Sequence, residues 1–207
     1  MRRTWLRQAL DAAEGFAGSV RHNLAMSPQS SADREDQRRR FVADPDVLAE
    51  LGVAIEQLAD RDTRSLVIRH EHPEFEEALK EGRREIEGPG GPMNPRLHLA
   101  MHEIVATQLW DDSPPEVWDT AERLLNEGHE RHQILHMLGR LVSDQVWEAL
   151  HEERPYDRER HLAALRALPG PWERERTAKT AAARHDDARK QARRAARAAR
   201  RRNRRPN

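Results

Sequence analysis

The sequence predicts an all-α protein, a small helical bundle followed by a basic C-terminal tail that is either disordered or a solvated helix. Apolar residues recur at intervals of three and four along much of the chain, as on the buried face of a helix. Alternating apolar and polar runs, which indicate strands, are nearly absent. Hydrophobic residues make up 37% of the chain and aromatic residues 4%, so the expected core is small and aliphatic.

The N-terminal part of the chain divides into two segments before the predicted helical domain. Residues 1–26 are predicted to form an amphipathic helix with Trp5 and Phe16 on its apolar side. Residues 27–44 are polar and rich in turn-forming residues, so we expect a linker there. The helical domain is then expected to span residues 45–171, and the basic tail residues 172–207.

The first histidines of the helical domain are His70 and His72, which stand immediately before Pro73. Two residues apart on a helix, their side chains would not converge on one ligand. Because proline ends or begins a helix, the pattern is interpreted as a helix end rather than as a ligand pair. Residues 88–92, rich in glycine and proline, are predicted to form a sharp loop before Asn94.

Two histidine pairs dominate the stretch from 94 to 139. The pairs are His98 with His102 and His132 with His136, and the spacing of four places both members of a pair on one helical face. A fifth histidine, His129, precedes the second pair by one short turn. Two imidazoles so spaced can direct their nitrogens at one point, as on the histidine-bearing helix of a zinc protease.

Both pairs are expected on core-facing helices. Asn94 is a good N-cap and Pro95 suits the first helical position, so a helix is predicted over 95–110 with its histidines on the apolar stripe. Residues 111–115, which include two prolines, should end it and begin another helix. A helix near 127–150 would place its own histidines on one face, opposite the first pair.

These residues predict a transition-metal site in the bundle core. The candidate ligands are His98, His102, His129, His132, His136 and Glu127. Imidazole ligands with one carboxylate suit zinc, nickel, cobalt, copper or non-haem iron and exclude calcium and magnesium, and zinc or iron is the expected ion. The alternatives are a buried network of hydrogen-bonded histidines and a chance grouping. If three histidines and a water surround the ion, Glu103 is the candidate catalytic base of a hydrolase, and an oxidoreductase is the other enzyme class. Four histidines would hold a structural or stored ion.

The same stretch resembles a known family. The sequence Asn94-Pro95-x-x-His98-x-x-x-His102, with Glu127, His132 and Leu138-Gly139 further on, resembles the bacterial family called domain of unknown function 1841, over about residues 65–150. The upstream His72-Pro73-Glu74-Phe75 is similar to that family's His-Pro-Glu-aromatic step. Gly128 stands where the family tends to have a histidine. The resemblance therefore implies either His129 with His132 or His132 with His136 as the second pair, and it implies no activity.

The charge of the chain is divided between body and tail. Residues 172–207 carry fourteen Arg and Lys against four Asp and Glu, a net charge of +10, so residues 1–171 carry −10. Such a tail can bind nucleic-acid phosphates by counterion release, which makes a nucleic-acid or ribosome-associated accessory protein the alternative function. A merely solubilising terminus explains the composition equally well.

Some classes of protein are excluded by what the sequence lacks. There are no cysteines, so disulfides, cysteine zinc sites and thiol catalysis are excluded. No apolar run approaches the roughly 18 residues of a membrane span, and the N-terminus has no signal-peptide pattern. We therefore expect a cytoplasmic protein with no membrane partner.

Overall fold

The computed structural model describes residues 28–88, 91–152, 156–174 and 177–178. The chain divides into two compact units, Met1–Leu168 and Pro169–Asn207. The helix predicted over residues 1–26 lies outside the described residues, as does the basic tail from residue 179 onward. The description below concerns the first unit.

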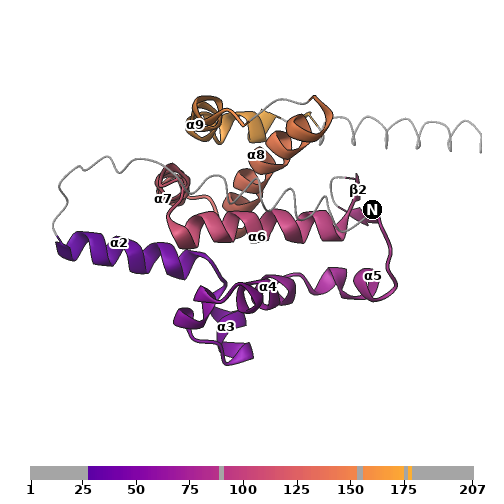
Figure 1. Cartoon of the computed structure of the whole chain (residues 1–207), viewed down its shortest axis with the longest axis horizontal. Helices are drawn as coiled ribbons and strands as arrows, with labels where there is room; N and C mark the ends of the chain where they lie inside the picture. The colour runs from indigo at the N-terminus through magenta and orange to yellow at the C-terminus, as the bar shows by residue number, and fades with distance from the viewer. Residues whose placement is uncertain (1–27, 89–90, 153–155, 175–176, 179–207) are drawn as a thin grey trace, which may run out of the picture. The chain divides into compact units, whose positions relative to one another are not determined.

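The described part of the first unit is mostly helical, which confirms the predicted fold class (Figure 1). Its elements, in chain order, are α2 (Pro28–Phe41), α3 (Pro45–Leu51), the 3₁₀ helix η1 (Ile55–Ala59), α4 (Arg61–His70), the 3₁₀ helix η2 (Pro73–Phe75), α5 (Glu76–Lys80), β1 (Ile86–Gly88), β2 (Gly91–Met93), α6 (Pro95–Asp111), α7 (Glu116–Asn126), α8 (Arg131–His151) and α9 (Arg158–Ala167). No helix in the described ranges is long and apolar enough to cross a membrane.

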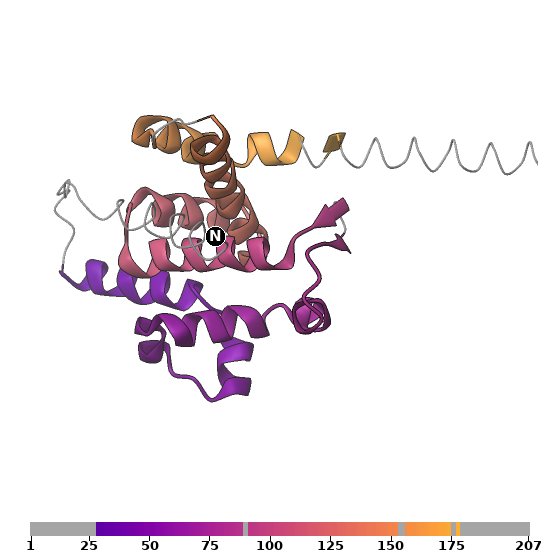
Figure 2. The same ribbon diagram turned by 45° about the vertical axis from the view of Figure 1, so that its right-hand side comes forward.

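Helix α6 is the central element of the bundle. It packs against α2, α4 and α5 on one side and against α7 and α8 on the other (Figures 1 and 2). The predicted start of this helix is confirmed, since the Asn94 side chain accepts hydrogen bonds from the backbone N–H groups of Arg96 and Leu97. Helix α8 lies close to α6, and a Cβ added at Gly139 would be 3.6 Å from Cβ of Met101. The histidine pairs therefore lie on two helices in direct contact.

The stretch predicted as a linker is instead helical from Pro28 to Phe41. This helix has no continuous apolar stripe, and polar contacts attach it to the bundle. The buried Arg38 guanidinium donates hydrogen bonds to the backbone carbonyls of Leu109 and Trp110 at the end of α6. Arg34 pairs with Asp119 of α7. Pattern analysis missed the helix because these partners lie 70 or more residues away.

A short hairpin occupies part of the predicted 88–92 loop (Figure 2). Strands β1 and β2 are antiparallel, and Ile86 lies opposite Met93. Gly91 has a φ of 105°, a backbone conformation that favours glycine. The hairpin leads directly into Asn94 and so sets where α6 begins.

The connection before α8 also differs from the prediction. Helix α7 ends at Asn126, and Gly128 follows with a φ of 90°, which breaks the helix. Helix α8 begins only at Arg131. His129 therefore lies in the connection and not on the helical face that carries His132.

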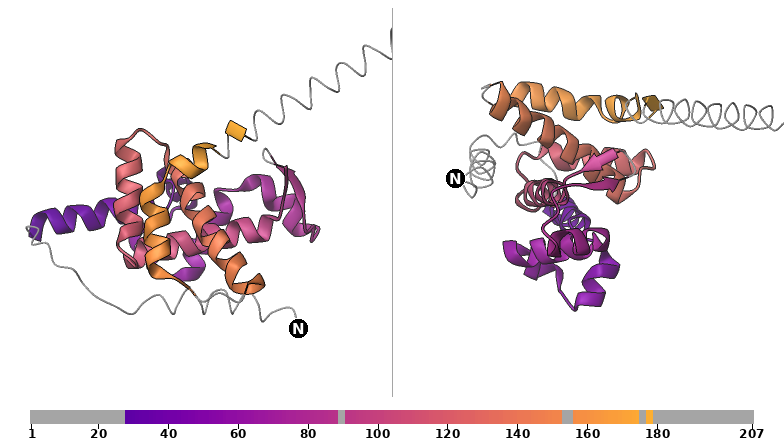
Figure 3. Two further views of the ribbon diagram at one scale, coloured as in Figure 1. Left: turned by 90° about the horizontal axis from the view of Figure 1, so that it is seen from above. Right: turned by 90° about the vertical axis from the view of Figure 1, so that its right-hand side faces the viewer.

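Helix α7 packs with α9 on the side of the bundle away from α4 (Figure 3). Its buried face consists of Val117, Trp118, Thr120, Ala121 and Leu124. The Arg123 guanidinium links α7 to the end of α9 by donating to the backbone carbonyl of Leu168 at 2.9 Å. The buried face of α7 and the Arg123 hydrogen bond therefore hold α7 in its place in the bundle.

This packing predicts different costs for two adjacent leucines. Leu124 is fully buried and Leu125 is 38% exposed. Leu124→Ala should lower the free energy of unfolding by about 2–5 kcal/mol, because a buried leucine leaves a cavity. Leu125→Ala should lower it by less than about 1 kcal/mol. Urea denaturation of both variants would measure the difference, and equal losses would contradict the described orientation of α7.

Candidate metal centre

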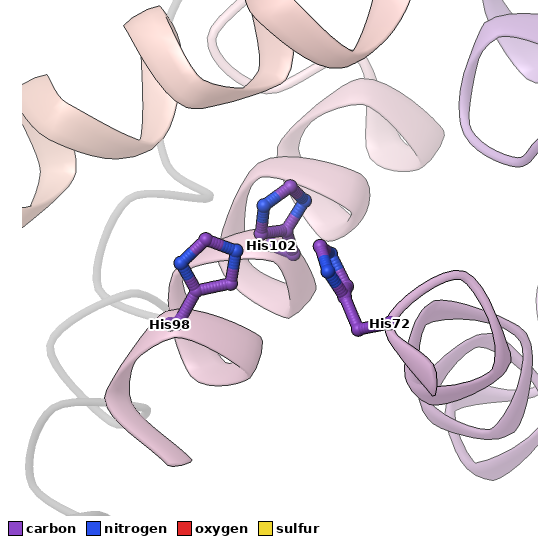
Figure 4. Close-up of side chains that lie close together, drawn as sticks. All are labelled: His72, His98 and His102. Atoms are coloured by element: carbon purple, nitrogen blue, oxygen red, sulfur yellow. The ribbon is translucent and has the colours of Figure 1, made fainter. Parts of the chain in front are cut away.

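Five imidazole rings gather between α6, α8 and the start of η2. They belong to His72, His98, His102, His132 and His136, and neighbouring ring centroids lie 4.4–5.5 Å apart. Helix α6 contributes the first predicted pair and α8 the second. His72 directly precedes η2, and its ring lies in the same cluster. Figure 4 shows the rings of His72, His98 and His102 turned toward one another.

The cluster contains two overlapping groups with the geometry of a metal site. One is His72, His98 and His102, and the other is His102, His132 and His136. Within each group, one nitrogen from each ring lies within 4.8 Å of the others. Zinc–nitrogen bonds are about 2.0–2.1 Å long, so nitrogens on one ion lie roughly 3–4 Å apart. Small ring rotations would therefore bring either group to bonding distance.

Three nitrogens of the first group have no hydrogen-bond partner among the described residues. They are the buried Nε2 atoms of His72, His98 and His102. A buried polar atom left without a partner costs about 1–3 kcal/mol. A buried network of hydrogen-bonded histidines, the main alternative, would pair these atoms with one another or with neighbouring side chains. Their lack of partners therefore favours a site that binds a ligand from outside the protein chain.

Glu74 determines which nitrogen of His72 is available. Nδ1 of His72 lies 2.9 Å from Oε1 of Glu74. An ionised carboxylate only accepts hydrogen bonds, so Nδ1 carries the proton and Nε2 keeps its lone pair. A carboxylate that accepts from the second nitrogen of a histidine ligand is the usual arrangement behind metal-bound imidazoles.

Phe75 forms an apolar wall beside the cluster. Its ring stacks on His72 with centroids 5.3 Å apart and an interplanar angle of 12°. The edge-on contact with His98 has a centroid distance of 5.0 Å. Because Phe75 is 2% exposed, it limits water at this side of the cluster and fixes both rings.

Burial lowers the pKa of four of the clustered imidazoles. Burial and the neighbouring His72 and His132 lower the pKa of His98 to about 4, and burial together with other imidazoles lowers that of His136 to about 3. The same causes lower the pKa of His102 and His132. Burial alone would raise the pKa of Glu74, but the hydrogen bond from His72, a backbone hydrogen bond and the nearby imidazoles together hold this pKa below its usual range. At neutral pH His98, His102, His132 and His136 are therefore uncharged.

The structure brings together four of the six predicted ligands. His98, His102, His132 and His136 belong to the two groups, whereas His129 and Glu127 belong to neither. Glu127 lies at the end of α7, where its carboxylate accepts a 2.8 Å hydrogen bond from Arg123. Of the two second pairs that the family resemblance implied, the structure thus assembles His132 with His136.

The predicted base, Glu103, is likewise outside both groups. It follows His102 directly on α6, and adjacent helical residues do not face the same side. Burial lowers the pKa of Arg64, and the Glu103 carboxylate is one of the nearby charges that oppose this lowering. The carboxylate at the cluster is that of Glu74.

Sequence reasoning missed His72 as a member of the cluster. The interpretation of a helix end was correct, because α4 ends at His70 and His72 precedes η2. Beyond the helix end the two histidines diverge: His70 is exposed beside Glu50, whereas His72 is 2% exposed in the cluster. The signal that could have identified it was the His-Pro-Glu-aromatic step of the family resemblance.

The lowered pKa values predict that the metal-free protein loses stability in mild acid. Below about pH 6.5 the unfolded chain binds protons on these histidines, whereas folded His98 stays neutral to about pH 4. Stability should therefore be complete above pH 6.5 and fall as the pH falls toward 4. Burial also lowers the pKa of His161 to about 4, so this residue contributes to the same loss of stability. The contribution of the cluster must therefore be measured with single-residue variants.

We expect His98→Leu to make the loss of stability with falling pH less steep than in the wild type between about pH 7.5 and 5.5. The free energy of unfolding, measured in urea with chelator present, provides the test. Equal slopes for His98→Leu and wild type would mean that His98 is protonated in the folded state as readily as in the unfolded chain.

Comparison with known proteins identifies the family. The model of the family described as Domain of unknown function (DUF1841) matches residues 33–167, a wider span than the motifs alone suggested. No curated protein and no solved structure matches the chain at a significant level. The matched span includes α3 through α9, most of α2 and all five clustered histidines. The chain belongs to the DUF1841 family.

Proposed function

We propose that the protein binds one transition-metal ion through His72, His98 and His102. Two observations carry the proposal: one nitrogen from each of these rings lies within 4.8 Å of the others, and the buried Nε2 atom of each ring lacks a hydrogen-bond partner among the described residues. The Nδ1 contact of His72 with Glu74 supports it, because this contact leaves the lone pair of Nε2 free. His132 and His136, which form the second group with His102, are further candidate donors.

The donor set fits a first-row transition metal, and we propose zinc or iron. Imidazole nitrogens suit zinc, copper, nickel and non-haem iron, whereas calcium and magnesium need oxygen ligands. Both groups consist of histidines alone. Three neutral imidazoles leave the charge of a divalent ion uncompensated, and the carboxylate of Glu74 lies close enough to offset part of it through His72.

The exposure of the histidines suggests how the ion is reached. His72 and His102 are buried, His98 and His136 are half-buried, and His132 is exposed. His132 is the exposed member of the cluster, so a substrate could approach the site from there. Zinc would support Lewis-acid chemistry such as hydrolysis, and iron would also support redox chemistry. The identity of the bound ion would therefore separate these reaction classes.

The first test compares two histidines two residues apart. Purified protein should bind about one zinc or cobalt(II) ion, and His72→Ala should weaken that binding by a factor of about 100 or more, because it removes a ligand. His70→Ala should leave the affinity unchanged, since His70 is exposed and outside both groups. Competition with a chromophoric chelator gives the affinities.

Metal analysis of the purified protein completes this test. A wild-type protein that takes up no near-stoichiometric zinc, iron or cobalt would contradict the proposal. Equal affinities of wild type and His72→Ala would contradict the assigned ligands and leave His102, His132 and His136 as the remaining group.

The second test concerns Glu74. Glu74→Gln replaces the carboxylate by a neutral amide, so metal affinity should fall by a factor of about 10–100. Glu76→Gln is the matched control, because Glu76 is exposed and pairs with Lys80 at 2.5 Å. Isothermal titration with zinc measures both. An unchanged affinity in Glu74→Gln would show that His72 is not oriented by this carboxylate.

A further inference from the structure

A buried ion pair connects two of the segments that carry the histidine cluster. The Glu71 side chain is 5% exposed and that of Arg131 is 17% exposed. The pair is bidentate: the two terminal nitrogens of Arg131 donate to the two carboxylate oxygens of Glu71, each at 3.1 Å. Glu71 caps the end of α4, and Arg131 is the first residue of α8. The pair thus bridges 60 residues of sequence.

Both side chains make further hydrogen bonds to backbone groups. Arg131 donates from Nε to the carbonyl of Phe41 and from a terminal nitrogen to that of Val42, each at 2.8 Å. Glu71 accepts a 2.6 Å hydrogen bond from the backbone N–H of Asp44. The guanidinium and the carboxylate are thus each held by several contacts, so neither can move without breaking several of them.

Each member of the ion pair directly precedes a histidine of the cluster. Glu71 precedes His72, and Arg131 precedes His132. His98 and His102 have their spacing set by a helix, but His72 lies between α4 and η2, outside any helix. Something other than a helix must therefore hold its backbone at the right distance from α6 and α8.

A purely stabilising role accounts poorly for this pair. Removing two charges from water is costly, and buried ion pairs can often be replaced by apolar residues without loss of stability. Binding sites, in contrast, need their ligands held to within about 0.5 Å by a supporting shell of residues. A rigid, bidentate pair adjacent to two ligand-bearing positions meets that need.

We propose that Glu71 and Arg131 are positioning residues of the metal centre, which hold the His72 segment against the start of α8. This inference rests on the proposed function. In this role the pair sets the position of His72, which lies outside any helix, relative to the candidate ligands on α6. Without the pair, His72 would still stack on Phe75. Its segment would no longer be joined to α8 through Glu71.

The experiment measures cobalt(II) binding by the full chain at a temperature where circular dichroism shows every variant fully folded. Arg131→Met keeps most of the side-chain volume and removes the charge and all donors. Its cobalt(II) affinity should fall about tenfold or more, with a changed visible absorption spectrum. Glu71→Gln keeps an oxygen that can accept from the backbone N–H of Asp44, so its cobalt(II) affinity should fall less than that of Arg131→Met. Arg131→Lys keeps the charge but loses the planar fork, so it should lie between Arg131→Met and wild type.

Arg123→Met is the matched control. Arg123 also binds a carboxylate and backbone carbonyls, those of Glu127, Leu165 and Leu168, but it joins α7 to α9, which carry no member of the cluster. It should lower the melting temperature and leave both the affinity and the spectrum of bound cobalt(II) unchanged.

The outcomes separate this inference from the proposed function. A wild type that binds no cobalt(II), zinc or iron overturns both. A wild type that binds while folded Arg131→Met and Glu71→Gln bind equally well, with the same spectrum, overturns the positioning role alone. Should Arg131→Met fail to fold, Glu71→Gln and Arg131→Lys decide the question by the same two readouts.

Discussion

Three imidazole nitrogens, buried together without protein partners, are the constraint on which the centre of this structure depends. Each of the Nε2 atoms of His72, His98 and His102 has lost its contact with water and gained no hydrogen bond from the described residues. Such atoms oppose folding, and the surrounding apolar core must offset them. That core includes α6 and α8, on which Val105, Leu109, Ile134, Met137 and Leu138 are all buried. A ligand that accepts three lone pairs would convert the opposing contribution into a favourable one.

The cluster combines two ways of placing a side chain. A helix places residues four apart on one face, so each pair on α6 and α8 is determined within a single turn. The two pairs meet because α6 and α8 pack closely, with Gly139 beside Met101. His72 has no such local determinant: its place depends on the end of α4, the Phe75 contact and the Glu71–Arg131 pair. The spacing within each pair is therefore set by local helical structure, whereas the position of His72 depends on tertiary contacts.

This difference explains how much could be predicted from sequence. Helical periodicity and the Asn94–Pro95 start placed α6 correctly, and spacing alone identified four of the clustered histidines. The sequence did not predict α2, because this helix is attached through contacts such as those of Arg38 with α6, which leave no apolar pattern. His129 was placed on a helix that Gly128 interrupts. His72 was missed since its spacing from His70 has no helical meaning. The roles of Glu103 and of residues 179–207 stay predictions, for no described contact tests them.

Protons and a metal ion compete for the same lone pairs, and burial changes that competition in a particular direction. A buried imidazolium is disfavoured, as the lowered pKa values of His98 and His136 show, so few protons need to leave when an ion binds at neutral pH. Burial also disfavours a divalent ion, which carries more charge than a proton. The difference lies in geometry: an ion contacts several nitrogens at once, whereas each proton binds one. Glu74 adds to this difference, since its carboxylate holds His72 with Nε2 unprotonated and lies near the charge that an ion would bring. A convergent set of buried imidazoles with one adjacent carboxylate would therefore bind a multivalent ion in preference to protons, as the proposed function requires.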